Sequence, residues 1–585
     1  MDLARREVTR REAREAGETR EAGEERKAGR GSGTLRSAVP RLALTVPPAV
    51  FLALFFAYPV AAITARGLYE GGRWHPERFA EVLTDPGILG VLWFTLWQAA
   101  ASTALTLLLA LPGAYVLARY DFPGRRLLRA AVTVPFVLPT VVVGSAFLGL
   151  LGRGGLLAQW GVPPVTGPAA ILLAHVFFNY AVVVRIVGGL WAQLDPRQEE
   201  AARVLGAGRL AAWRTVTLPA LAPAAAAAAL MVFLFTFTSF GVVQILGGPR
   251  YATLEVEIYR QTAQLLDLPT AAVLTLVQFA AVAVLLAVHA RTVRRHRGTS
   301  GLVDAAGTAR RPRGPRQWTL LAAVVAQVAV LLLTPLAVLV ERSLSGPDGY
   351  GLAHYRALAS ADASGGTFTV APLEAVGNSL SYAAVATAIA LAVGVPAAVA
   401  LTLRGPGGSA GHLVRGLDAL LMLPLGTSAV TVGFGFLIAL DEPPLDLRSS
   451  WILVPLAQAL VGVPFVVRGL LPVLRAVDHR LREAAAVLGA SPARVWREVD
   501  LPLVRRSLLV AAGFAFAVSL GEFGATVFIA RADAPTLPVA VARLLGRAGP
   551  ENYGQAMALS TILMVVCAAV LLVLEGIRTE RHGEL

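Results

Sequence analysis

The sequence holds few of the residues from which soluble catalytic sites, metal sites and disulfide frameworks are built. It has one cysteine in 585 residues, Cys567, which has no partner for a disulfide. Charged residues make up 15% of the chain, whereas 56% of it is hydrophobic and its mean hydropathy is +0.63. A soluble protein of this length needs far more polar surface, but lipid accepts an apolar exterior. The composition therefore indicates a protein that lies in a membrane.

Lysine is nearly absent from the chain. The only one is Lys27, which follows Glu25 and Arg26. A phosphate-binding P-loop needs a lysine after a glycine-rich turn, where its ammonium group reaches the β- and γ-phosphates of the nucleotide. This chain cannot build a P-loop, so an ATPase that drives it must be another subunit. No spacing of metal ligands is present either, and we expect neither a metal nor a cofactor.

The net charge of +14 comes from arginines that lie mainly in short loops between apolar runs. In such loops, arginines set the topology of a membrane protein and contact lipid headgroups. We therefore expect the lipid bilayer as a partner, and no nucleic acid. With the N-terminus inside, the arginine-richest loops fall on the cytoplasmic face. This predicts a multi-pass protein of the cell membrane with both termini in the cytoplasm.

Apolar runs long enough to cross a bilayer recur along the chain, since a spanning helix needs about 20 such residues. They predict an all-α polytopic membrane protein with about 12 transmembrane helices. Residues 1–40 bury too little to order themselves, and we expect a charged, disordered cytoplasmic tail there. The expected spans cover residues 41–65, 88–118, 130–152, 168–192, 220–246, 269–290, 317–341, 379–403, 416–440, 450–473, 507–530 and 555–577.

The chain repeats itself at an offset of 283 residues, since Glu200-Ala201-Ala202-Arg203-Val204-Leu205-Gly206 matches Glu483-Ala484-Ala485-Ala486-Val487-Leu488-Gly489. Six spans per half are an even number, so the halves are parallel repeats. We expect a first half at 41–296, a cytoplasmic linker at 297–316 and a second half at 317–578. Further matches at this offset are Arg185 with Arg468, Trp213 with Trp496, Leu218-Pro219 with Leu501-Pro502, Phe240-Gly241 with Phe523-Gly524, and Thr253-Leu254 with Thr536-Leu537.

Each Glu-Ala-Ala segment is expected between the fourth and fifth span of its half, on the cytoplasmic face. Its alanines keep one helical face thin, so another protein can approach closely. Gly206 and Gly489 can take the left-handed conformation that ends a short helix. In the second copy, Ser491 and Pro492 are placed to cap and start another helix. One copy alone is only a good helix former, but two equivalent copies predict a helix–turn–helix that docks a partner.

These segments resemble the Glu-Ala-Ala loop of ABC importer permeases, which inserts into a cleft on a cytoplasmic ATPase. The resemblance implies a type I permease of the fused two-half kind, as in the thiamine and ferric-iron importer group. It implies two copies of a cytoplasmic ABC ATPase and an extracytoplasmic solute-binding protein as partners, with ATP hydrolysis left to the ATPase. By this resemblance the ATPase-coupling residues are Glu200, Ala201, Gly206, Glu483, Ala484 and Gly489.

Two further stretches, residues 172–179 and 247–259, are similar to segments of thiamine permeases. The stretch at 519–524, in which an acid is followed by Phe-Gly, fits both the thiamine and the ferric-iron group. The resemblance therefore implies thiamine as the solute, with ferric iron as the alternative.

Three polar side chains within the expected spans are candidates for the substrate pathway. His175 is a candidate substrate contact, although a lone histidine in a helix bundle is more often hydrogen-bonded to a neighbouring helix. Asn179, one turn further on the same face, is its expected interhelical companion. Glu522 is too costly to face lipid, so we expect it in the bundle interior or a water-filled cavity. There it helps a cationic substrate pass, or it holds interhelical hydrogen bonds.

Two other classes of protein fit the sequence less well. An ion-coupled secondary transporter is also built from two parallel six-helix halves, but it uses acids and bases inside the membrane. Here the expected spans are nearly free of them, Glu522 being the clearest exception. The duplicated docking segments also have no role in such a transporter. A membrane enzyme lacks support, because no His/Asp/Ser constellation or metal-ligand spacing is present.

Overall fold

The computed structural model describes residues 43–295, 309–346, 349–360, 370–402, 416–418, 420–421, 428–441 and 445–579. Within these residues, eleven helices are long and apolar enough to cross a membrane. The fold is therefore an all-α polytopic membrane protein, as predicted. The predicted tail at 1–40 and most of the predicted linker at 297–316 lie outside the described residues.

The first half alternates long helices with short elements at their ends. Its first span covers Ala43–Leu68 and contains the π-turn η1 (Ala53–Ala57) followed by α2 (Tyr58–Leu68). The other long helices are α4 (Pro86–Arg119), α6 (Thr140–Leu151), α8 (Pro168–Gln193), α11 (Leu218–Phe237) and α14 (Leu268–Arg295). The short elements are β1 (Tyr69–Glu70), β2 (Arg73–Trp74), α3 (Glu77–Thr84), α5 (Arg125–Thr133), η2 (Val134–Val137), α7 (Leu156–Gln159), α9 (Pro196–Val204), α10 (Arg209–Ala212), η3 (Trp213–Thr217), α12 (Gly241–Leu246) and α13 (Leu254–Ala263).

The second half repeats this order. Its long helices are α15 (Pro315–Val328) with the π-turn η5 (Ala329–Leu333) and α16 (Thr334–Leu344), then α18 (Glu374–Thr402), α21 (Leu453–Ala476), α24 (Leu501–Gly521) and α27 (Pro550–Thr579). The shorter elements are β3 (Ser345–Gly346), β4 (Gly349–Tyr350), α17 (Ala353–Ala357), α20 (Ala429–Ala439), α22 (His479–Val487), α23 (Pro492–Val495), η7 (Trp496–Asp500), α25 (Thr526–Ile529) and α26 (Leu537–Leu545).

Two predicted spans, 220–246 and 507–530, are broken near the same place in the repeat. In the first, α11 ends at Phe237, and the carbonyl oxygen of Thr236 accepts a hydrogen bond from Gln98 Nε2 at 2.8 Å. In the second, α24 ends at Gly521, before an acid that caps the following turn. Side chains thus replace helical hydrogen bonds at both breaks, which is why apolar length alone did not predict them.

Two more predicted spans differ from the observed helices. The run at 130–152 is divided into α5, η2 and α6, because Pro135 and Pro139 have no backbone N–H to continue the helix. The run at 416–440 has no long counterpart among the described residues. Its longest described part is α20, an apolar helix of 11 residues that starts after the N-cap Ser428.

Four π-turns extend the repeat beyond the matches seen in the sequence. Each of η1, η3, η5 and η7 ends two residues before a proline. A proline ring clashes with the carbonyl four residues earlier and cannot donate to it, so the helix widens at that turn. Pro219 and Pro502 are 283 residues apart, whereas Pro59 and Pro335 are 276 apart. The first spans therefore repeat too, at a smaller offset.

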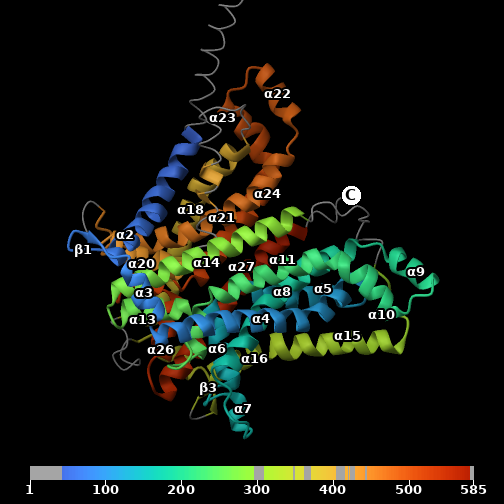
Figure 1. The fold of residues 1–585 in the computed structure, drawn as a ribbon, viewed down its shortest axis with the longest axis horizontal. Helices are drawn as coiled ribbons and strands as arrows, with labels where there is room; N and C mark the ends of the chain where they lie inside the picture. The colour runs from blue at the N-terminus through green and yellow to red at the C-terminus, as the bar shows by residue number, and fades with distance from the viewer. Residues whose placement is uncertain are drawn as a thin grey trace, which may run out of the picture.

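The connections fall at two opposite ends of the helix bundle (Figure 1). We call the end with the β1–β2 and β3–β4 hairpins, α13 and α26 the hairpin end. The end with α9, α10, α22 and α23 is the loop end. Helices α4, α8 and α11 lead to α9–α10, while α18, α21 and α24 lead to α22–α23, and these two groups diverge in Figure 1. The halves are therefore together at the hairpin end and apart at the loop end.

The first span of each half packs against the other half. Helix α2 contacts α20, and α16 contacts α6. At the first of these contacts Gly435 permits a close approach, because a Cβ there would lie 2.9 Å from the Cβ of Pro59. This exchange joins the halves into one bundle.

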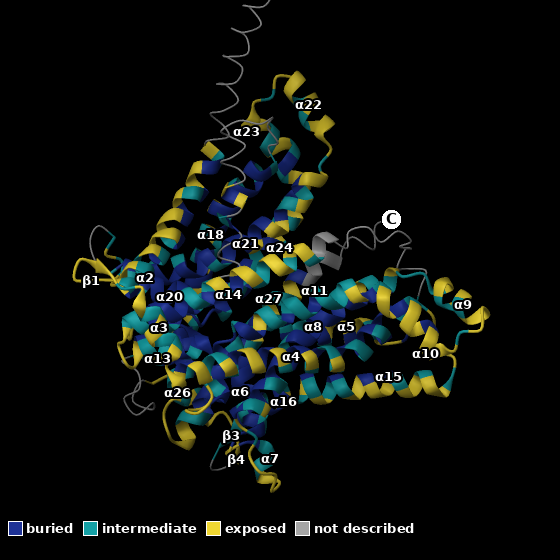
Figure 2. Ribbon diagram, in the orientation of Figure 1, coloured by how far each residue is buried: buried dark blue, intermediate teal, exposed yellow. Residues whose placement is uncertain are grey.

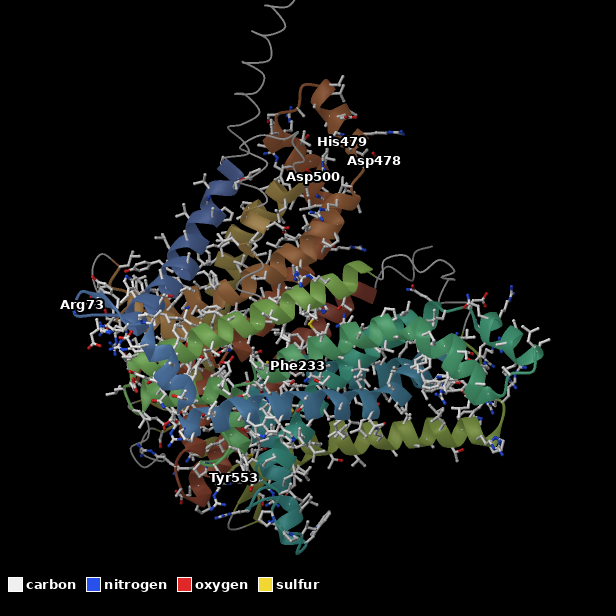
Figure 3. All side chains as sticks on the ribbon, in the orientation of Figure 1. Arg73, Phe233, Asp478, His479, Asp500 and Tyr553 are labelled. Atoms are coloured by element: carbon white, nitrogen blue, oxygen red, sulfur yellow. The ribbon has the colours of Figure 1, made fainter. Side chains whose placement is uncertain are left out.

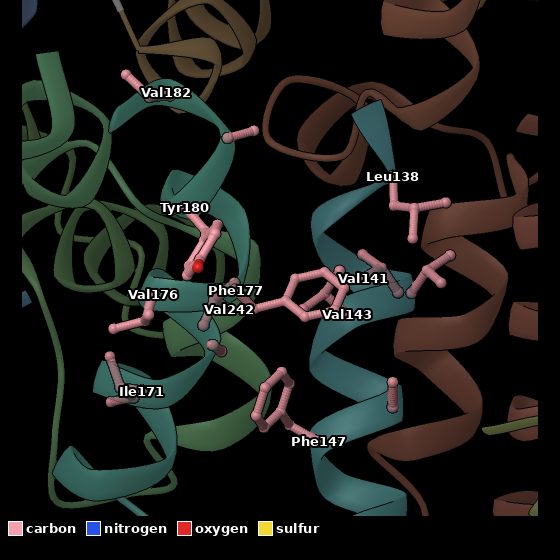
Figure 4. Packing of buried hydrophobic residues seen from close by; sticks show 14 of the residues in the cluster. Leu138, Val141, Val143, Phe147, Ile171, Val176, Phe177, Tyr180, Val182 and Val242 are labelled. Carbon is pink, nitrogen blue, oxygen red and sulfur yellow. The ribbon is translucent and has the colours of Figure 1, made fainter. Parts of the chain in front are cut away.

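The interior of the first half is filled by apolar side chains of α6 and α8 (Figure 4). Phe147 and Phe177 meet edge to face, with ring centroids 5.7 Å apart, which is a favourable aromatic geometry. One turn further along α8, Tyr180 lies against Gly113 of α4, and its Oη would be 2.3 Å from a Cβ added there. Helices α4, α6 and α8 therefore form a tightly packed support for the loop that follows α8.

Candidate functional site

The structure places the predicted helix–turn–helix at the loop end of each half. We call residues 196–212, with α9 and α10, the first Glu-Ala-Ala loop, and residues 479–495, with α22 and α23, the second. Asp195 caps α9 by accepting from the backbone N–H two residues on at 3.0 Å, and Asp478 caps α22 in the same way at 2.9 Å. Ser491 caps α23, as predicted. Both loops are thus built from the same local signals.

Gly206 and Gly489 make the turn inside each loop. Their φ angles are +95° and +83°, which confirms the predicted left-handed conformation. The amides of Ala207 and Ala490 donate to the carbonyls five residues earlier at 3.1 and 3.0 Å, a Schellman ending. A Cβ at either glycine would have no heavy atom within 4 Å. Backbone conformation, not space, therefore requires glycine here.

Each loop exposes a pair of large apolar side chains just before its glycine. Val204 and Leu205 are 87% and 88% exposed, and Val487 and Leu488 are 86% and 87% exposed. Figure 2 shows how exposed α9 and α22 are as a whole. Apolar surface in water is unfavourable, so an equivalent exposed pair in both halves points to a partner that covers it. Sequence reasoning missed these pairs, although each stands beside the Glu-Ala-Ala residues. Those predicted coupling residues are also exposed: Glu200, Ala201, Gly206, Glu483, Ala484 and Gly489.

Each loop is tied to the helix that follows it through the same two positions of the repeat. Thr217 Oγ1 donates to Glu199 at 2.8 Å in the first half, and Arg482 Nε donates to Asp500 Oδ1 at 2.8 Å in the second. Figure 3 shows Asp500 beside the second loop. The residue types differ, but the connection from loop to π-turn is kept. Each loop is therefore joined by a side-chain hydrogen bond to the π-turn that precedes α11 or α24.

The two glutamates of the motif make only surface ion pairs. Glu200 lies 3.0 Å from Arg310, and Glu483 lies 2.9 Å from His479 within α22. Pairs this exposed contribute little to stability, on the order of 0–1 kcal/mol. Both carboxylates therefore remain accessible to a docking partner.

At the opposite end, two equivalent aromatic rings meet between the halves. Phe240 and Phe523 stack with centroids 5.2 Å apart and an interplanar angle of 26°, and both are buried. Equivalent residues of two repeats contact each other only near the axis that relates the repeats. The pseudo-two-fold axis therefore passes by this Phe240–Phe523 stack. Tyr259 flanks it, with its ring 5.5 Å from Phe240 and 5.4 Å from Phe528.

Beside the stack, the short helices α13 and α26 are held in the same way. Thr95 Oγ1 on α4 accepts from the backbone N–H of Leu254 at 2.9 Å, and Ser379 Oγ on α18 accepts from that of Leu537 at 2.7 Å. Each hydroxyl satisfies an amide at a helix start, where no helical partner exists. The hairpin end is thus closed by equivalent contacts in both halves.

His175 lies on α8 between two hydroxyl groups. Its Nδ1 is 3.0 Å from Ser102 Oγ and its Nε2 is 2.8 Å from Ser239 Oγ, so it joins α8 to α4 and to the break after α11. These are the interhelical hydrogen bonds that are more usual for a lone buried histidine. The expectation that Asn179 is its interhelical companion was wrong, because Asn179 Nδ2 donates to the His175 carbonyl within α8 at 2.9 Å. The imidazole therefore supports the segment that carries Phe240.

Glu522 is buried next to Phe523 and faces the bundle interior, as predicted. Its two carboxylate oxygens accept from the backbone N–H groups of Ala525 at 2.7 Å and Thr526 at 3.0 Å. These bonds cap the turn that starts α25 rather than joining two helices. Local capping explains how an acid is accommodated here, and the pathway role remains a prediction.

Glu255 is a buried acid that sequence reasoning did not select. It is fully buried and accepts hydrogen bonds from Gln278 Nε2 and from Ser428 Oγ, the latter in the second half. Its repeat counterpart is Pro538, so only the first half supplies this bridge. Within the described residues, no group of three or more His, Cys, Asp or Glu side chains is placed to hold a metal.

Comparison with known proteins agrees with this arrangement. Residues 107–297 match the family described as "Binding-protein-dependent transport system inner membrane component". The Thiamine transport system permease protein ThiP of Brucella abortus (strain 2308) is 30% identical over 550 residues, covering 92% of this chain and 96% of that protein. The protein of the same name from Salmonella typhimurium is 28% identical over 561 residues, covering 93% and 96%.

A single-half relative is similar to only part of the chain. The Sulfate transport system permease protein CysT of Salmonella typhimurium is 31% identical over 218 residues, which are 36% of this chain and 77% of that protein. Permeases of this kind work with an ATPase and a solute-binding protein. Near-complete coverage by two-half permeases, together with the repeated loops, shows that the chain belongs to the binding-protein-dependent ABC importer permeases, as a multi-pass membrane component in which two halves are fused.

Proposed function

We propose that this chain is the membrane subunit of an ABC importer for thiamine, with no enzyme activity of its own. The observation that carries the proposal is the pair of equivalent Glu-Ala-Ala loops, each with an almost fully exposed Val-Leu pair. Thiamine is assigned as the solute because relatives named as thiamine permeases align with more than nine-tenths of the chain.

Each Glu-Ala-Ala loop docks one copy of the ATPase, so one chain takes two copies. Leu205 and Leu488 enter an apolar part of the ATPase cleft, and Glu200 and Glu483 contact its polar rim. Because ATP is cytoplasmic, this places the loop end in the cytoplasm. The first described helix starts at that end and α27 finishes there, so both termini are cytoplasmic as well. The absence of a lysine other than Lys27 supports leaving ATP hydrolysis to the partner.

The translocation pathway runs between the halves, along the pseudo-two-fold axis. The Phe240–Phe523 stack closes it toward the hairpin end, while the halves diverge toward the loop end. Each ring follows a helix that starts at a Glu-Ala-Ala loop; the spans Arg209–Phe237 and Pro492–Gly521 are each about 45 Å long. When the ATPases draw the loops together, these helices tilt as levers and separate the rings.

The chemistry around the stack suits a cationic aromatic solute. Thiamine is a cation with aromatic rings, and the faces of Phe240 and Phe523 attract such a group once they part. The carboxylate of Glu522 adds negative charge beside them. His175 and Asn179 line the same segment from α8 and become accessible only when the rings separate. These residues are therefore assigned to the substrate pathway, although none of them is open in this conformation.

The test is uptake of radiolabelled thiamine by cells that express the complex. We expect ATP-dependent uptake that excess unlabelled thiamine abolishes and excess ferric iron leaves unchanged. ATP-dependent uptake of radiolabelled ferric iron, with no uptake of thiamine, would establish the ferric-iron alternative instead. Uptake that a protonophore abolishes while ATP is held constant would indicate a secondary transporter and overturn the proposal.

A further inference from the structure

A cavity of about 610 Å³ lies between the halves, away from the Phe240–Phe523 stack. One wall is α8 of the first half, and the other is the face formed by α21 and α24 of the second. Three of its lining residues are arginines, one from each of these helices. The residues that matter here are Arg185, Phe465, Arg468, Arg506, Ser507 and Phe514.

The position of the arginines places this cavity on the loop side of the molecule. Arg185 and Arg468 are equivalent in the repeat, so the cavity lies near the pseudo-two-fold axis. Each stands eight residues before the end of its helix at the loop end, about 12 Å along the axis. The aromatic stack lies beyond the opposite ends of α11 and α24. The cavity is therefore a vestibule open toward the loops and separate from the closure.

The lining of the vestibule concentrates positive charge. No aspartate or glutamate is among its lining residues. Arg185 and Arg506 make no hydrogen bond or ion pair with any residue that the structure describes. Asp418 acts electrostatically on Arg468 but does not line the cavity. All three arginines are exposed in the vestibule, so water or an anion, and not lipid, must solvate their charge.

The lining fits one class of anion best. Guanidinium groups present planar forks of N–H donors that bind phosphate oxygens in pairs. Ser507 adds a hydroxyl, and Phe465 and Phe514 offer apolar surface for the rest of a ligand. The volume falls within the usual range of small-molecule sites, roughly 300–1,000 Å³.

We propose that this vestibule, lined by Arg185, Arg468 and Arg506, is a binding site for a phosphate-bearing anion. This goes beyond the proposed transport of thiamine, which is a cation and gains nothing from the three arginines. The phosphate comes either from a soluble phosphate ester in the cytoplasm or from a phospholipid headgroup. Both sources use the same chemistry, and the test separates them.

The test is calorimetric titration of the purified chain with inorganic pyrophosphate in phosphatidylcholine nanodiscs. We expect saturable binding that Arg185→Gln/Arg506→Gln weakens by about tenfold or more, since each substitution removes charge-assisted hydrogen bonds. Arg505→Gln is the matched control, because Arg505 is exposed on the same helix as Arg506 is, but it does not line the cavity. Thermal unfolding checks that all variants are folded. Thiamine is not used, so failure here leaves the proposed function untouched.

Nanodiscs that contain phosphatidylglycerol distinguish the two sources of phosphate. If the anionic lipid abolishes pyrophosphate binding in the wild type, the headgroup is the resident ligand; if binding persists, the ligand is a soluble anion. Both results support a phosphate site. No saturable binding in either nanodisc, or equal affinity in Arg185→Gln/Arg506→Gln and Arg505→Gln, overturns the proposal.

Discussion

At Gly206 and Gly489 a single residue decides whether a docking loop can form. Both take positive φ with open space around them, so a side chain is excluded by backbone conformation alone. Their role was predictable from the sequence, because each follows a short helix-forming segment and precedes another helix start. The exposed leucines beside them were visible in the sequence too, but exposure is a property of the folded chain.

Gly489→Val should uncouple transport while the chain remains inserted. A β-branched residue in the left-handed region costs about 1–3 kcal/mol, which the turn avoids by changing shape. We expect lower ATP-dependent uptake and less co-purified ATPase. Gly489→Asn is the control, because asparagine tolerates this conformation. Equal uptake in the valine and asparagine variants would remove the role assigned to this turn.

Two substitutions of Glu522 distinguish its role as a helix cap from the role of its negative charge. Glu522→Gln keeps an acceptor for one of the two backbone N–H groups but loses the charge, whereas Glu522→Leu loses both bonds. We expect the glutamine variant to assemble with the ATPase and to take up thiamine more slowly. We expect the leucine variant to be destabilised by about 2 kcal/mol or more as well. Normal uptake in the glutamine variant with loss in the leucine variant would leave Glu522 a capping residue only.

The proposed closure at the Phe240–Phe523 stack can be tested by cross-linking engineered cysteines, because the chain has a single native cysteine. In a Cys567→Ala background, Phe240→Cys/Phe523→Cys should be joined by a short bis-maleimide, and uptake should stop while ATPase binding continues. The control is Phe233→Cys/Phe237→Cys, a pair 6.1 Å apart within α11 itself, whose cross-link leaves that helix able to tilt. Uptake that continues after complete cross-linking of the first pair would contradict the proposed closure.

At the scale of elements, the first helix of each loop is tied to the start of the lever helix by a side-chain hydrogen bond. The second tie joins Arg482 to Asp500, and Arg482 also donates to the carbonyl of Leu474. Sequence reasoning could not find this tie, because the first half uses Glu199 and Thr217 at the same positions. The two halves share the geometry of this contact but use different residue types, so no repeated sequence motif marks it.

Arg482→Ala should let the ATPase bind but weaken the transfer of its motion to α24. We expect ATP hydrolysis by the complex to continue and uptake per ATP hydrolysed to fall several-fold. Arg480→Ala, an exposed arginine on the same helix, should leave this ratio unchanged. A ratio that is the same in both variants would show that Arg482 does not connect the loop to the lever.

The breaks near Phe240 and Glu522 show where span prediction from apolar length stops being sufficient. Both lie in runs apolar enough to read as continuous helices. Gln98 ends the first through a hydrogen bond that depends on the packed structure, whereas Glu522 ends the second by capping the next turn locally. The sequence predicted about 12 spans, and eleven helices among the described residues are long and apolar enough to cross a membrane. It did not predict the turn that brings two phenylalanines onto the axis.

At the scale of the whole molecule, the repeat could be predicted from the sequence, but the contacts between the two halves could not. The offset of 283 residues indicated two parallel halves, but nothing in it indicated that Phe240 meets Phe523 or that Glu255 reaches Ser428. Such contacts depend on how the halves pack, which a linear pattern does not encode. The arginine vestibule has the same origin, since its walls come from both halves.

The most direct measurement of the central claim is the mass of the intact complex, isolated from membranes through a tag on this chain. Native mass spectrometry should give one chain with two ATPase copies in the wild type. Leu205→Asp or Leu488→Asp, each at an almost fully exposed site, should leave one copy, and the double variant none. Two ATPase copies in the double variant would contradict the claim that the Glu-Ala-Ala loops are the docking sites.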